Sequence, residues 1–187
     1  SLWYRTILGY RKAKKKFKFN IDKKYLAIMK CGNVCEQKTR LFKALEDLQI
    51  LDNFAWSCLY PASWLKSKTP KFFASEINFS STDKEMPCIE ESQSFISVVI
   101  ETFSQNHWWL KPCATEKTWK SLASGCPVLW WSPHDVTPGI KRHGFETDFI
   151  DIDTTYLSEP DNEARLLLLV KQVQKLLQPG FAEHLYV

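Results

Sequence analysis

Three polar residues that could bind a phosphorylated ligand stand together at Thr115, Glu116 and Lys117, directly before a stretch with helical spacing. Thr115 is a suitable N-cap, and the amide groups of a first helical turn attract phosphate. Lys117 adds a cation there, and Glu116 or Glu101 could accept hydrogen bonds from sugar hydroxyls. The residue types indicate a candidate site for a phosphorylated sugar. The alternative is an ordinary capped helix whose Glu and Lys face solvent.

Two further positions extend this candidate site. Glu101 and Thr102 follow the apolar run Phe95–Ile100, so they would emerge at the carboxyl end of a strand, where open parallel sheets bind ligands. Arg40 lies one turn into an expected helix, where its guanidinium could reach a diphosphate. For Arg40 the alternative is a surface arginine paired with Glu36 at the i, i+4 spacing.

The elements that would position these residues alternate along the chain. Apolar runs predict strands at Tyr25–Met29, Phe54–Tyr60, Phe95–Ile100, Val128–Trp131 and Phe149–Ile152, with Gly32-Asn33 ending the first. Helices are expected over Glu36–Gln49, from the cap Thr115 to Gly125, over a short stretch ending at Gly144, and from the cap Asp161 to Pro179-Gly180. This order predicts an α/β fold, a doubly wound parallel sheet with helices on both faces.

Length and composition favour a single folded domain. The chain has 187 residues, is 44% hydrophobic and contains eight tryptophans, which excludes a disordered polymer. No apolar run approaches the roughly 20 residues that cross a bilayer, and the amino end lacks a secretory pattern. The six cysteines form neither a disulfide framework nor a zinc set, which indicates free thiols in a reducing compartment. We therefore expect a cytoplasmic protein with a folded domain over residues 24–187.

A basic segment, residues 1–23, would precede that domain. The first 30 residues hold ten Lys or Arg and one Asp, a net charge of +9, whereas the rest of the chain carries −5. We interpret this segment as a solvated linker or helix face, with attraction to nucleic acid or an anionic membrane as the alternative. That alternative supports a second function, a non-catalytic α/β binding module tethered to an anionic polymer through its basic amino end.

The segment ISVVIET…ATEKTWKSLASGCPVLWW resembles the donor-binding motif of the α-1,3-fucosyltransferase family. The matching residues are Glu101, Thr115, Glu116, Lys117, Leu122, Gly125, Pro127 and Val128. The stretch KTRLFKAL resembles the family's phosphate-contacting helix and points to Arg40. A second pattern, TEKTWK…GCPV…IKRHGFETDFIDIDTTY, is similar to uncharacterised phage or viral proteins with glycosyltransferase-like carboxyl domains. Together the two resemblances cover roughly residues 24–178.

The resemblance implies the second, Rossmann-like half of a GT-B glycosyltransferase. Its ligand would be a nucleotide-diphosphate sugar, GDP-linked in that family, whose sugar passes to a glycan or other hydroxyl acceptor with inversion. Lys117 and Arg40 would contact the diphosphate, and Glu116 would help to hold the nucleotide-sugar. Thr102 stands where the family has asparagine and Cys113 where it has tyrosine, which leaves the identity of the donor open.

The acceptor side is less defined. In GT-B enzymes the general base and acceptor site come mostly from an amino-terminal domain, which this chain would lack, so the catalytic residue is unknown. His107 and Trp108 could contact an acceptor sugar from a loop, with packing of that loop on its own domain as the alternative. A cationic clamp can replace a metal, and Asp151-Ile152-Asp153 is interpreted as a turn, so we expect neither metal nor cofactor. No GxGxxG or GxxxxGK[ST] motif suggests another nucleotide-dependent enzyme.

Overall fold

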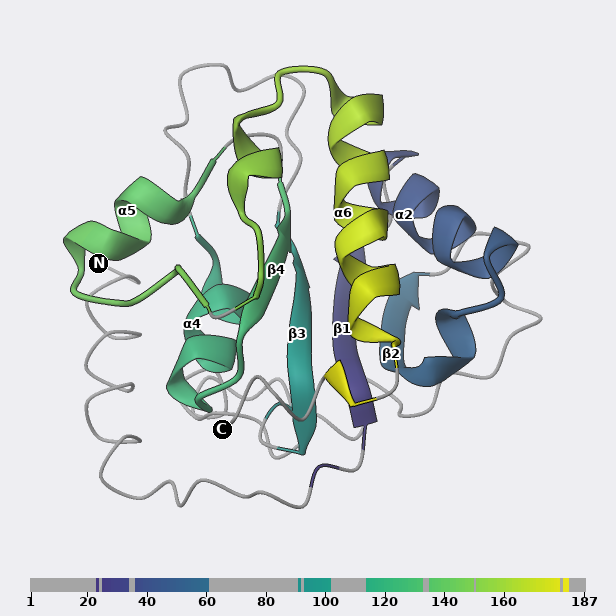
Figure 1. Cartoon of the computed structure of the whole chain (residues 1–187), viewed down its shortest axis with the longest axis horizontal. Coiled ribbons are helices and arrows are strands. Elements are labelled where there is room, and N and C mark those ends of the chain that lie inside the picture. The colour runs from purple at the N-terminus through teal and green to yellow at the C-terminus, as the bar shows by residue number, and fades with distance from the viewer. Residues whose placement is uncertain are drawn as a thin grey trace.

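The computed structural model is an α/β domain built on a four-stranded sheet (Figure 1). It describes residues 23, 25–33, 36–60, 91, 93–101, 114–132, 135–149, 151–178 and 180–181. The strands are β1 (Tyr25–Asn33), β2 (Phe54–Tyr60), β3 (Ser94–Ile100) and β4 (Val128–Trp131). They lie in the order β2-β1-β3-β4, and every neighbouring pair is parallel. The predicted α/β class and parallel sheet are confirmed.

Helices connect the strands and follow the last one. They are α2 (Glu36–Asp47), the 3-10 helix η1 (Leu51–Asn53), α4 (Glu116–Ala123), α5 (Thr137–Arg142), the 3-10 helix η4 (Thr155–Ser158) and α6 (Asn162–Leu176). Asp161 caps α6 as predicted, because its carboxylate accepts a hydrogen bond from the Ala164 amide at 2.8 Å. Gly125 adopts a φ of 67° just after α4, the left-handed conformation that ends many helices.

Two adjacent tryptophans on β4 identify the helix that covers each face of the sheet. Successive side chains of a strand point to opposite faces. The indole of Trp130 donates to the hydroxyl of Thr118 in α4 at 2.9 Å, whereas the indole of Trp131 donates to the carbonyl of Gln37 in α2 at 2.9 Å. Helices α4 and α2 therefore lie on opposite faces, and α6 lies beside α2 (Figure 1).

The packing of α2 shows why its sequence folds against the sheet. Leu41, Phe42 and Leu45 recur at helical spacing and are buried on the inner face of the helix. The Phe42 ring meets the indole of Trp56 on β2 edge-on, with ring centroids 5.6 Å apart. Burying a side chain of this size stabilises the fold by about 1.5–3 kcal/mol.

Tyr156 binds the backbone of Trp130 in β4, the strand at one edge of the described sheet. The Glu101 amide donates to the Trp131 carbonyl at 2.9 Å, so the polar groups of Trp130 face away from β3. The Tyr156 hydroxyl accepts from the Trp130 amide and donates to the Trp130 carbonyl, each at 2.8 Å. Burial raises the pKa of this phenol above its ordinary value.

The predicted strand at Phe149–Ile152 is wrong. The Ile152 amide donates to the Phe149 carbonyl at 3.1 Å, and Asp151 has a φ of 63°. These features make a turn, and a left-handed residue interrupts an extended chain. This agrees with the interpretation of residues 151–153 as a turn.

The ends of the first strand and of the first helix also differ from the prediction. The strand expected to stop before Gly32-Asn33 continues to Asn33, because Asn33 still pairs with Tyr60 on β2. The first helix ends at Asp47 rather than Gln49, since Gln49 adopts a φ of 58° and the next amide turns back to the Leu45 carbonyl at 3.0 Å.

Some predictions lie outside the described residues. They include the basic segment except for Lys23, and most of the long connection between β2 and β3. Within the described part of the chain, no helix combines the length and apolar character needed to cross a bilayer.

Candidate functional site

The strand order reverses between β1 and β3. From β1 the chain passes through α2 to β2 on one side, and from β3 it passes through α4 to β4 on the other. The helices that follow β1 and β3 along the chain, α2 and α4, lie on opposite faces of the sheet (Figure 1). Open parallel sheets bind ligands at such a reversal, at the carboxyl edge of the sheet.

We define the switch-point site by the described polar residues at this edge: Lys38, Glu101, Thr115, Lys117 and Thr118. Glu101 follows β3 directly, the residues from Thr115 to Thr118 begin α4, and Lys38 lies in the first turn of α2. Thus the structure brings the predicted residues Glu101, Thr115 and Lys117 together.

The carboxylate of Glu101 is held in a fixed orientation. Its side chain is 1% exposed, and Oε1 accepts hydrogen bonds from the Thr115 amide at 2.9 Å and from the Thr118 hydroxyl at 2.6 Å. Since Trp130 donates its indole N–H to Thr118 Oγ1, the hydroxyl proton of Thr118 is directed to Glu101. One oxygen of the carboxylate therefore connects the end of β3 to the first turn of α4.

The other oxygen, Glu101 Oε2, is buried and has no hydrogen-bond partner among the described residues. An unsatisfied buried acceptor costs about 1–3 kcal/mol, so this position calls for a donor such as a hydroxyl. Glu101 also places a negative charge at the positive end of the α4 dipole. An anion that approached this helix end alone would meet a like charge.

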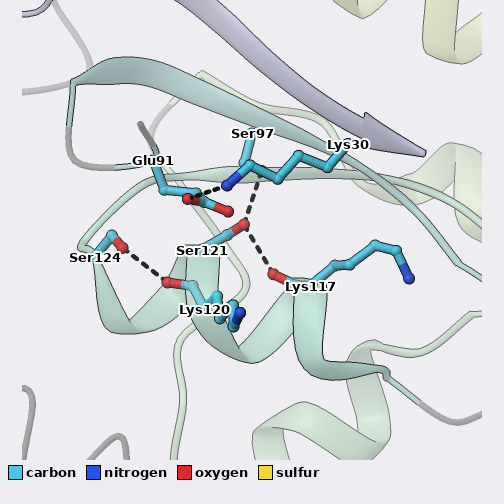
Figure 2. Close-up of polar contacts among 7 residues, drawn as sticks. All are labelled: Lys30, Glu91, Ser97, Lys117, Lys120, Ser121 and Ser124. Atoms are coloured by element: carbon cyan, nitrogen blue, oxygen red, sulfur yellow. Dashed lines mark hydrogen bonds and ion pairs between the residues drawn. The ribbon is translucent and has the colours of Figure 1, made fainter. Parts of the chain in front are cut away.

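Lys117 supplies a cation beside this carboxylate. Its Nζ donates to Thr115 Oγ1 at 3.5 Å, while the Thr115 amide binds Glu101. Figure 2 shows the Lys117 side chain extending from the start of α4, away from Ser121. Thr115 occupies the predicted N-cap position with extended backbone, but its side chain makes no capping hydrogen bond.

Arg40 faces α6. Its guanidinium donates to Glu36 Oε1 at 2.6 Å and also forms an ion pair with Glu163 at the start of α6. The pair with Glu36 is the alternative given by the sequence, and Glu163 adds a second carboxylate. These two groups offset the charge of Arg40, and its predicted contact with a diphosphate stays a prediction.

Lys38 was missed by the sequence analysis. It is 8% exposed and lies on the same inner face of α2 as Leu41, Phe42 and Leu45. These four positions follow the i, i+3, i+4, i+7 spacing of one helix face. That spacing would have placed Lys38 inside and Arg40 outside, but the interpretation of Arg40 rested on its place one turn into the helix and on the resemblance.

A separate polar cluster lies against the α4 face of the sheet. Lys30 on β1 forms a 2.9 Å ion pair with Glu91, and the Ser121 hydroxyl in α4 donates to Ser97 on β3 at 2.7 Å (Figure 2). Glu91 precedes β3, so the ion pair extends toward the amino ends of the strands, away from the switch-point site. We therefore assign this cluster to stability.

The remaining predicted site residues are not placed. Thr102, His107 and Trp108 lie outside the described residues, as does the side chain of Glu116, whose backbone begins α4. In the described part of the chain, Cys31 and Cys126 are buried and form no disulfide. Across those same residues, no group of three or more His, Cys, Asp or Glu side chains could hold a metal ion.

No family model, curated protein or solved structure matches this chain. Its function must therefore be inferred from the switch-point site and from the motif that spans β3, α4 and β4.

Proposed function

We propose that this domain binds a nucleotide-diphosphate sugar at the switch-point site and forms the donor-binding half of a GT-B glycosyltransferase. Such a ligand carries hydroxyl groups that donate hydrogen bonds and a diphosphate that needs cations and N–H donors. Glu101 Oε2 is an open acceptor for a hydroxyl, and Lys117 with the first turn of α4 suits a phosphate.

One observation carries the proposal. Thr115 joins an acceptor to a cation, because its amide binds Glu101 Oε1 at 2.9 Å and its hydroxyl accepts from Lys117 Nζ at 3.5 Å. The two functional groups needed for a phosphorylated sugar therefore lie side by side at the reversal of the strand order. The alternative given by the sequence, a capped helix whose Glu116 and Lys117 face solvent, makes no use of the buried carboxylate of Glu101.

The doubly wound, Rossmann-like GT-B architecture belongs to this proposal. Its support is the parallel sheet with α2 and α4 on opposite faces, together with the resemblance of β3, α4 and β4 to the fucosyltransferase donor motif. That resemblance favours a GDP-linked sugar.

The proposed reaction transfers the sugar with inversion. The bond between the anomeric carbon and the diphosphate oxygen breaks, a bond to the acceptor oxygen forms, and the acceptor proton passes to a general base outside the described residues. Negative charge develops on the leaving diphosphate. Lys117 and the amides that begin α4 would stabilise it, and Arg40 is a further predicted contact.

Titration calorimetry with GDP, UDP, ADP and guanosine tests the binding step. We expect one of the diphosphates to bind, and Lys117→Ala to remove a charge-assisted contact worth about 1.5–3 kcal/mol, about 10- to 150-fold in Kd. Guanosine, which has no phosphate, should bind both proteins equally.

Lys120→Ala is the matched control, because Lys120 lies three residues further along the same helix. It should leave the Kd for the diphosphate unchanged. Equal affinity of the wild-type protein and Lys117→Ala for every diphosphate would reject the proposed site, and the absence of any diphosphate binding would reject the function.

A further inference from the structure

Trp130 fixes the direction in which the Thr118 hydroxyl donates its proton. An indole N–H can only donate, so the oxygen of Thr118 accepts from Trp130 at 2.9 Å. The single hydroxyl proton then goes to Oε1 of Glu101 at 2.6 Å. All three side chains are buried, so water does not compete for these bonds. Thr118 therefore binds Glu101 with one defined polarity.

The bond from Thr118 determines which oxygen of Glu101 is left open. Oε1 also accepts from the Thr115 amide at 2.9 Å, so it binds two donors, whereas Oε2 is buried without a hydrogen-bond partner among the described residues. The terminal torsion of a glutamate has a broad, roughly two-fold distribution. A carboxylate held by the Thr115 amide alone could rotate about this torsion, and the second donor opposes that rotation. Thr118 thus holds Oε2 in one place.

A fixed acceptor at Oε2 selects a ligand that carries a hydrogen-bond donor. A buried acceptor that stays unpaired is costly, and a donor from a ligand removes that cost. The carboxylate would repel a phosphate oxygen, whereas a hydroxyl can donate to it. A site that pairs a buried polar group with a ligand hydroxyl rejects the analogue without that hydroxyl, because the buried group is then left unpaired. Glu101 can therefore distinguish ligands by a single hydroxyl.

We infer that Thr118 is a positioning residue of the switch-point site, and that it holds Glu101 so that Oε2 selects ligands by one sugar hydroxyl. That hydroxyl belongs either to the ribose of the nucleotide or to the transferred sugar. The inference rests on the proposed function and deepens it, since it identifies a group that the site recognises. Glu101 contacts the ligand, and Thr118 acts through Glu101.

Calorimetry on the full wild-type chain tests which hydroxyl is recognised. The ligands are GDP, UDP, their 2′-deoxy and 3′-deoxy forms, GDP-fucose and UDP-glucose. For a ribose hydroxyl, one deoxy form should bind about tenfold or more weakly than its parent diphosphate. For a hydroxyl of the transferred sugar, the deoxy forms should match the parent, and a nucleotide-sugar should bind about tenfold or more tightly. Equal affinities throughout each series would indicate only a buried water at Oε2, and would reject the inference.

Variants of α4 test whether Thr118 produces this preference. Thr118→Val replaces the hydroxyl with a methyl group of similar size and should remove most of the preference, whereas Thr118→Ser should keep it. Ser121→Ala is the matched control, because Ser121 is also buried in α4 but its hydroxyl binds Ser97. An unchanged preference in Thr118→Val, or an equal loss in Ser121→Ala, would overturn the inference.

Thermal unfolding separates positioning from folding. Thr118→Val and Ser121→Ala each remove a buried hydroxyl and should lower the melting temperature, but only Thr118→Val should change the ratio of affinities. In a Glu101→Gln background, Thr118→Val should not change that ratio further, and a further change would show that Thr118 does not act through Glu101. If Thr118→Val does not fold, Thr118→Cys provides the same comparison, because a thiol is a weak donor.

The outcomes also distinguish this inference from the proposed function. Diphosphate binding that depends on Lys117 but shows no preference for a hydroxyl would retain the function and reject the inference. A preference for guanosine over its 2′-deoxy or 3′-deoxy form that depends on Thr118, without binding of any diphosphate, would reject the function and retain the positioning role. A wild-type chain that binds none of these ligands would reject both.

Discussion

The hydroxyl of Thr118 donates a 2.6 Å hydrogen bond to Oε1 of Glu101, and both side chains are buried. The same hydroxyl oxygen accepts from the indole of Trp130 at 2.9 Å. Residues from β3, α4 and β4 are therefore joined in one chain of hydrogen bonds. The orientation of the Glu101 carboxylate is a property of the fold, established before any ligand binds.

Glu101 variants should separate this structural contact from ligand binding. In Glu101→Gln the amide oxygen can still accept from Thr115 and Thr118, so we expect a free energy of unfolding within about 1 kcal/mol of the wild type. The amide nitrogen would then replace Oε2, and an acceptor for a ligand hydroxyl becomes a donor. Binding of a nucleotide-sugar should weaken, which calorimetry would measure.

The matched variant Glu101→Ala removes both oxygens. It leaves two buried donors without an acceptor, and we expect a loss of about 2–4 kcal/mol in urea unfolding. Equal stability of Glu101→Ala and Glu101→Gln would contradict the role of Oε1.

The ion pair between Lys30 and Glu91 should stabilise the folded state because both side chains are buried or nearly so. Their side chains are 16% and 3% exposed. Glu91→Ala would leave the ammonium of Lys30 in a largely buried place, and we expect a loss near the lower end of the range for buried pairs, about 3 kcal/mol. The double variant Lys30→Met/Glu91→Leu should recover most of this loss in urea unfolding.

An exposed pair on α2 provides the control for that experiment. Lys43 and Asp47 form an i, i+4 pair whose side chains are 58% and 57% exposed. Lys43→Met should change the free energy of unfolding by only about 0.5 kcal/mol or less. If Glu91→Ala and Lys43→Met changed the free energy of unfolding by similar amounts, burial would not determine how much each ion pair stabilises the protein.

Tyr156→Phe should destabilise the protein at neutral pH and lose part of that effect in alkali. The variant leaves the amide and carbonyl of Trp130 without the phenol, a cost of about 1–3 kcal/mol. Burial raises the pKa of Tyr156 above its ordinary 10.0, so the unfolded chain releases this proton first. The stabilisation from the phenol is complete below that pH and decreases above it.

Urea unfolding of both proteins at several pH values measures this effect. Above about pH 10 the difference in unfolding free energy between the wild type and Tyr156→Phe should shrink by about 1.4 kcal/mol per pH unit. A constant difference from about pH 9 to about pH 11 would mean that the phenol titrates equally in the folded and unfolded states.

Local patterns predicted the elements of the fold better than their ends. Strands β2 and β4 have the predicted bounds because each is an apolar run with a clear terminus. The prediction of a strand at Phe149–Ile152 failed because a turn can also bury an apolar side chain. Ile152 lies beside such a turn and is only 7% exposed. The spacing of apolar residues in the sequence does not reveal the left-handed conformation of Asp151.

The candidate site was predictable where its residues are close in the sequence. Glu101 directly follows β3, and Thr115 and Lys117 lie at the start of the next helix along the chain, α4. The predicted alternation of strand and helix therefore placed all three at the carboxyl edge of the sheet. Glu163, the second partner of Arg40, lies far along the chain, so no local spacing could reveal the pair. The partner depends on the way α6 packs beside α2.

The hydroxyl of Tyr156 has a consequence for assembly. Since it already binds both backbone groups of Trp130, a further strand cannot pair with β4 at that residue without displacing the phenol. An exchanged strand from another copy, or an added strand from a neighbouring domain, would have to break both of these hydrogen bonds to extend the described sheet along β4.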